Sequence, residues 1–172
     1  MKTKSFLLIA FLSVSIPLLA QTGNRGNAEV RVNLKRIRID YGRPALDGRD
    51  SWDMFNKAPA GTVWRMGTDA ATEILSTGDL DIAGKRLAAG RYSLWVRKLA
   101  IDRWSLSFHP KTGIPGLPEP TAGFLAEAPL ALSKVDTFND QLLILLEANG
   151  NNVVISIYWG SSKLEGNLAV LS

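Results

Sequence analysis

The sequence predicts an all-β protein, a single antiparallel β-sandwich or barrel-like domain of about nine or ten strands with two long loops. Three observations lead to this prediction. Apolar and polar residues alternate over many short segments, which is the pattern of strands with one buried face. Glycine, asparagine and aspartate separate these segments, as expected of tight turns. No segment keeps the period of an amphipathic helix over several turns.

The N-terminus has the pattern of a secretory signal peptide. Two lysines precede an apolar run over residues 6–20, which is shorter than the roughly 20 residues of a membrane-spanning helix. We expect cleavage after Ala20, so that residues 1–20 are a signal peptide, 21–28 a flexible leader and 29–172 a single β domain. The alternative is an uncleaved anchor. Cleavage predicts a soluble protein in the periplasm or outside the cell.

Composition excludes several kinds of chemistry. The chain has no cysteine, which rules out disulfides, thiol catalysis and cysteine-ligated metals. The formal net charge is only +4, which together with export gives no reason to expect nucleic acid binding. His109 is the only histidine, so a multi-histidine metal site cannot form, and no G-x-S-x-G motif accompanies it. We therefore expect no metal and no cofactor.

Two strand patterns and a long connection open the predicted domain. The alternating apolar residues are Val30, Val32 and Leu34, then Ile37, Ile39 and Tyr41. The step of three between Leu34 and Ile37 breaks the alternation, which predicts a bulge or a tight turn there. Residues 42–61 form the first long loop, in which a short helical turn from Ser51 to Asn56 is expected, capped by Asp50.

The segment from Val63 to Ile74 concentrates aromatic, cationic and acidic side chains. Trp64 and Arg65 are neighbours, so on a strand they point to opposite faces. A turn and a second strand follow, which should bring Arg65, Asp69 and Glu73 close together. We expect a ligand site, or a structural ion pair of Arg65 with Asp69 or Glu73, at this point.

The rest of the chain continues the strand pattern. Further strands are predicted near residues 80–82, 92–96, 104–108, 141–148, 153–159 and 167–171. The five prolines between His109 and Pro129 exclude regular structure, so this is the second long loop. The run from Leu142 to Leu146 is continuously apolar, as expected of a strand covered on both faces. Asn149-Gly150 predicts a hairpin turn after it.

Several motifs, taken together, resemble a known family. They are Tyr41-Gly42-Arg43-Pro44, Gly48-Arg49, Trp64-Arg65-Met66-Gly67, Ala70-Ala71-Thr72-Glu73-Ile74, Gly84-Lys85 and Ala89-Gly90-Arg91-Tyr92-Ser93-Leu94. Over roughly Val30 to Trp159 the chain is similar to the secreted bacterial domain-of-unknown-function family 2911, of the Bacteroidetes type. The resemblance implies export to the envelope and one β-rich domain, and it implies no activity. The chain departs from the family pattern at Gly42, Met66 and Asp69-Ala70.

The candidate ligand-binding residues are Arg43, Arg49, Trp64, Arg65, Asp69 and Glu73. Guanidinium groups bind carboxylates, phosphates and hydroxyls, and tryptophan offers a flat apolar surface. The first hypothesis is a non-catalytic binding module for a polar or anionic ligand such as a glycan. The structural alternative for each tryptophan is the core.

Two other functions stay open. A carboxylate-dependent hydrolase could use Glu73 with a second acidic residue as acid and base. A structural or assembly protein of the envelope could pair its edge strands with a partner. The sequence assigns no catalytic residue and no oligomeric state.

Overall fold

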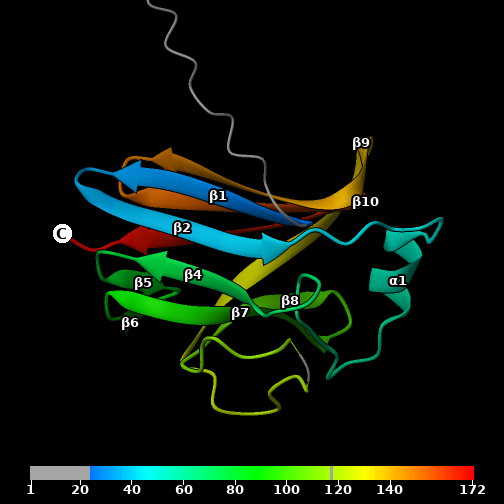
Figure 1. The fold of residues 1–172 in the computed structure, drawn as a ribbon, viewed down its shortest axis with the longest axis horizontal. Coiled ribbons are helices and arrows are strands. Elements are labelled where there is room, and N and C mark those ends of the chain that lie inside the picture. Colours follow the sequence, from blue (N-terminus) through cyan, green and yellow to red (C-terminus); the bar gives the residue numbers. More distant parts are fainter. Residues whose placement is uncertain (1–23, 117) are drawn as a thin grey trace, which may run out of the picture.

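The computed structural model describes residues 24–116 and 118–172. Over these residues the fold is all-β, with ten strands in one antiparallel sheet and one short helix (Figure 1). The sheet does not close into a barrel, because β1 and β6 remain its two edges. The predicted fold class, including the two long loops, is therefore confirmed. The predicted signal peptide, residues 1–20, lies outside the described residues.

The strands are β1 (Arg25–Val32), β2 (Lys35–Gly42), β3 (Val63–Trp64), β4 (Thr72–Ser76), β5 (Leu80–Ile82), β6 (Lys85–Leu87), β7 (Gly90–Ala100), β8 (Arg103–His109), β9 (Ala126–Asn149) and β10 (Asn152–Val170). Their order is β1-β2-β4-β7-β8-β9-β10-β5-β6, and β3 pairs with β7 beside this path. In Figure 1, β1 and β2 lie above β4 to β8, and the long strands β9 and β10 link the two levels. The sheet thus folds over on itself in a sandwich-like manner.

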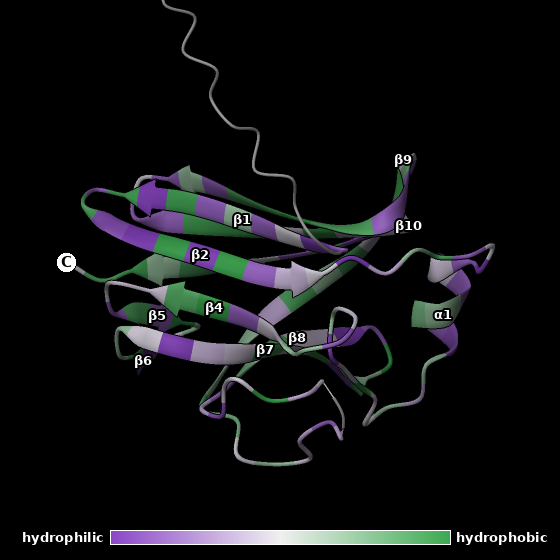
Figure 2. Ribbon diagram, viewed as in Figure 1, coloured by the Kyte–Doolittle hydropathy of each residue, from purple (hydrophilic) through white to green (hydrophobic). Residues whose placement is uncertain are grey.

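Alternation along the strands produces the hydrophobic core. On β2, Ile37, Ile39 and Tyr41 are buried and the residues between them are partly exposed. Figure 2 shows this as alternating green and purple bands along β2. Each fully buried isoleucine stabilises the fold by roughly 1.5–3 kcal/mol. One core cluster joins side chains from every strand except β3, whose Trp64 packs against it.

The first hairpin explains the break in the apolar pattern. Val32 pairs with Lys35, so Asn33 and Leu34 form a two-residue turn, with Asn33 at a φ of 54° and Leu34 95% exposed. The strand β1 begins at Arg25, whereas the sequence predicts a flexible leader over residues 21–28. Residues 25–28 belong to the sheet instead, because their main chain pairs with β2 and Arg25 forms an ion pair with Asp40.

The first long loop contains the predicted helical turn. The helix α1 (Ser51–Lys57) begins after Asp50, whose Oδ1 accepts hydrogen bonds from the main-chain N–H of Trp52 at 2.8 Å and of Asp53 at 3.3 Å. This cap satisfies two donors that the helix itself leaves unpaired. With seven residues α1 is too short to cross a membrane, and the described part of the chain holds no other helix that could.

Strands β9 and β10 differ from expectation in two ways. Leu142 and Ile144 are buried but Leu145 is 40% exposed, so this stretch has one covered face and not two. The separate last strand predicted over residues 167–171 is the end of β10, which runs without interruption from Asn152. A bulge around Gly160, at a φ of 59°, bends β10 and lets one strand serve both levels of the sheet.

Candidate functional site

Four aromatic side chains meet between α1 and the sheet, and we call them the aromatic cluster. They are Phe55 of α1, Trp64 of β3, Trp104 of β8 and Trp159 of β10. Trp64 and Trp159 are stacked, with ring centroids 5.4 Å apart and planes at 15°. Phe55 meets Trp64 edge to face at 5.3 Å and Trp104 at 5.4 Å. These are favourable aromatic geometries, so the cluster fixes the helix on the sheet.

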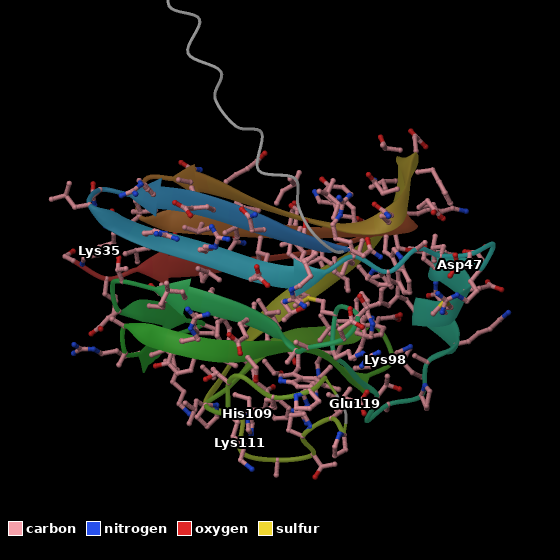
Figure 3. All side chains as sticks on the ribbon, in the orientation of Figure 1. Lys35, Asp47, Lys98, His109, Lys111 and Glu119 are labelled. Atoms are coloured by element: carbon pink, nitrogen blue, oxygen red, sulfur yellow. The ribbon has the colours of Figure 1, made fainter. Side chains whose placement is uncertain are left out.

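A cation lies at each end of the aromatic cluster. The Cζ of Arg49 is 5.4 Å from the centroid of Trp159, and the Nζ of Lys98 is 5.2 Å from that of Trp104. Lys98 is only 6% exposed, and its Nζ donates hydrogen bonds to the carbonyls of Phe55 and Asn56, each at 3.0 Å. Its charge therefore lies at the C-terminal end of α1, where the helix dipole favours a cation (Figure 3).

An apolar cleft opens beside the aromatic cluster. Its volume is about 160 Å³, and all four aromatic residues line it together with Met54, Ala58, Thr62 and Val63. Trp64 is partly exposed here, whereas the other three rings are almost covered. Ligand pockets for drug-sized molecules have about 300–1,000 Å³, so this cleft suits a single ring or one apolar side chain.

Arg49 lines a separate hollow of about 260 Å³, which we call the polar hollow because most of its lining residues are polar. It is lined by Gly48, Arg49, Asp50, Ser51, Phe138 and Ser161. Phe138 is 64% exposed, an unusual position for a large apolar side chain. It belongs to a part of β9 that projects from the sheet. In the pairing with β10, Gly160 is opposite Asn139 and Ser162 is opposite Lys134. The four residues 135–138 of β9 therefore face a single residue of β10, Ser161.

The two acidic residues of the predicted site, Asp69 and Glu73, accept hydrogen bonds from the second long loop. The Oε2 of Glu73 is 3.1 Å from the Nη1 of Arg91, and its Oε1 accepts the main-chain N–H of Gly113. The carbonyl of Asp69 accepts the N–H of Gly116 at 3.0 Å. A Cβ on Gly116 would lie 2.6 Å from the Cδ of Arg65, so this arginine packs against the same loop.

The predicted ion pair of Arg65 with Asp69 or Glu73 is therefore replaced, among the described residues, by the pair of Glu73 with Arg91. Arg91 lies on the neighbouring strand β7 diagonally from Glu73, since Glu73 is opposite Ser93 and Arg91 is opposite Leu75. Trp64 and Arg65 contact different surroundings, as their positions on opposite faces require.

The two remaining arginines bind main-chain carbonyls. The Nε of Arg43 donates to Leu142 O at 3.3 Å. Arg49 donates from Nε to Leu46 O at 2.7 Å and from Nη2 to Ala45 O at 2.9 Å. Of the six predicted residues, Trp64 and Arg49 thus lie at the aromatic cluster, and the others lie elsewhere.

The family model described as Protein of unknown function (DUF2911) matches residues 24–167. The chain belongs to this family. Neither a curated protein nor a solved structure matches it at a significant level. The match runs from the start of β1 almost to the end of β10, so the DUF2911 domain includes the aromatic cluster, both hollows beside Arg49 and the second long loop.

Sequence reasoning missed three important residues of this DUF2911 domain. Lys98 was indistinguishable from a surface lysine, because the carbonyls of α1 and the ring of Trp104 that contact its buried ammonium group are distant in sequence. Phe138 lay between predicted strands. Trp159 was predicted to lie on a strand, but the sequence did not indicate that its ring stacks on Trp64. Within the described residues of the DUF2911 domain, no group of three or more acidic or histidine side chains is placed to hold a metal ion.

Proposed function

We propose that the DUF2911 domain is a non-catalytic binding module of the cell envelope, and that it binds a glycan at the aromatic cleft and the adjoining polar hollow. The observation that carries this proposal is the combination of a partly exposed Trp64 with an exposed Phe138 around the polar residues Arg49 and Asp50. The signal-peptide pattern of residues 1–20 supports the envelope location.

The chemistry of the two hollows suits a sugar chain. A pyranose ring has apolar C–H faces that pack on aromatic rings and hydroxyls that need polar partners at its edge. Trp64 and Phe138 offer the rings. The Oδ2 of Asp50 and the Nη1 of Arg49 make no hydrogen bond within the described residues, so both can serve hydroxyls. Arg49 stacks on Trp159 and lines the polar hollow, so it joins the two subsites.

Binding to a glycan array, followed by titration of intrinsic tryptophan fluorescence, tests the proposal. Because Phe138 is exposed, Phe138→Ala should leave the Tm unchanged and weaken binding by about tenfold or more. The matched control is Leu34→Ala, which removes an even more exposed apolar side chain from the β1–β2 turn. An absence of glycan binding, or equal effects of the two variants, would contradict the proposal.

A further inference from the structure

The proline-rich loop that joins β8 to β9 lines a third hollow, away from the aromatic cluster. Its first part is held by Glu73 and Asp69, as described above, and its last part by a hydrogen bond from Leu125 N to Phe108 O at 2.8 Å. Between these anchors lies a hollow of about 600 Å³. This volume falls within the range of small-molecule sites.

His109 lines this hollow and can offer it a hydrogen-bond donor. It is only 6% exposed, and its Nδ1 accepts the main-chain N–H of Lys111 at 3.2 Å. The hydrogen of the neutral imidazole is therefore on Nε2. Across residues 24–116 and 118–172, Nε2 donates no hydrogen bond. Gly123 lies close to this nitrogen, since an added Cβ there would be 3.2 Å from Nε2.

Two opposite charges line the same hollow. Lys111 and Glu119 both line it, and they form no ion pair with each other in the part of the chain that is described. Ile114, Pro115 and Pro120 add apolar walls. A ligand that supplies a hydrogen-bond acceptor would pair with the Nε2–H of His109.

We propose that this hollow binds a small zwitterion, namely a free amino acid or dipeptide with an apolar side chain. The carboxylate accepts hydrogen bonds from His109 Nε2 and Lys111 Nζ. The ammonium group pairs with Glu119, and the side chain packs on the prolines. This site is separate from the proposed glycan site and does not depend on it.

The experiment compares leucine and glycyl-leucine with two blocked analogues, N-acetyl-leucine and leucinamide, by calorimetry. Leucine or glycyl-leucine should bind, and each blocked analogue should bind at least tenfold more weakly, because each lacks one of the two charges. Binding should also shift the ring resonances of His109, which are unique because the chain has one histidine.

Variants at the rim complete the test. Lys111→Ala and Glu119→Gln should each weaken binding about tenfold and leave the Tm unchanged, and Lys85→Ala on β6 is the matched control for a lost exposed lysine. The proposal is overturned if neither leucine nor glycyl-leucine binds at millimolar concentration, if the blocked analogues bind equally well, or if sodium acetate binds as tightly as leucine, which would indicate an anion site only.

Discussion

At the scale of single residues, Lys98 is a buried cation whose polar and aromatic partners come from α1 and β8. Its ammonium group satisfies two carbonyls at the end of α1 and lies over Trp104. A buried cation without such partners would cost several kcal/mol. Lys98 therefore connects the helix to β7, and it supports the wall of the aromatic cleft from behind.

Lys98→Met should lower the free energy of unfolding by about 2 kcal/mol, because methionine keeps the volume but donates no hydrogen bond to the two carbonyls. Urea unfolding measures this difference. Lys85→Met, at an exposed position of β6, is the control and should be nearly neutral. Equal midpoints for both variants would show that the Lys98 hydrogen bonds do not stabilise α1.

His109 provides a prediction on pH. Burial lowers the pKa of His109 below its ordinary value of 6.5, and the charge of Lys111 lowers it further. Because the pKa is lower in the folded state, protonation favours the unfolded chain. The stability contributed by neutral His109 is thus complete above pH 6.5 and is lost as the pH falls through the lower folded pKa.

An NMR titration of tag-free protein follows the ring protons of His109 without overlap, since no other histidine is present. The midpoint should lie below 6.5. A midpoint at that value would mean that this residue contributes no pH dependence to stability, and a midpoint above it would reverse the predicted sign.

At the scale of elements, the bulge of β10 has a strict steric requirement. Gly160 has a φ of 59°, and a Cβ there would lie 2.5 Å from the Oγ of Ser51 and 2.7 Å from the Cδ1 of Leu46. Ser51 is the first residue of α1, and its Oγ is 2.9 Å from that of Ser162. The bulge therefore seats the start of the helix directly on β10.

Gly160→Ala should cost more stability than Gly150→Ala, although both glycines have the same left-handed backbone, with φ of 59° and 60°. The conformational penalty alone is roughly 1–2 kcal/mol in either variant. Gly150 has nothing within 4 Å of a new Cβ, so only Gly160→Ala adds a clash. Urea unfolding compares the two, and equal losses would show that α1 shifts away freely.

Strands could be predicted from this sequence where one face of the strand is buried and the other face is exposed. The alternation of Ile37, Ile39 and Tyr41 sufficed for β2, and the capping residue Asp50 sufficed for α1. The stretch around Leu145 was misread, because continuous apolar sequence does not distinguish a fully covered strand from one with an apolar open face.

At the scale of the whole molecule, the candidate site depended on contacts that local patterns do not contain. Trp64 and Trp159 are stacked although they come from opposite ends of the domain, because β3 and β10 reach α1 from different levels of the sheet. Likewise Glu73 pairs with Arg91 through the register of β4 and β7. The residue types of the site could be predicted from the sequence, but their grouping required the strand order.

The position of β5 in the strand order determines when the β5–β6 hairpin can join the sheet during folding. Within residues 24–116 and 118–172, β5 pairs only with its hairpin partner β6 and with the last residues of β10, where Leu80 is opposite Val170. The β5–β6 hairpin therefore stays undocked until nearly the whole chain is present. If the chain is exported, as proposed above, this late docking would delay stable tertiary structure until translocation is almost complete.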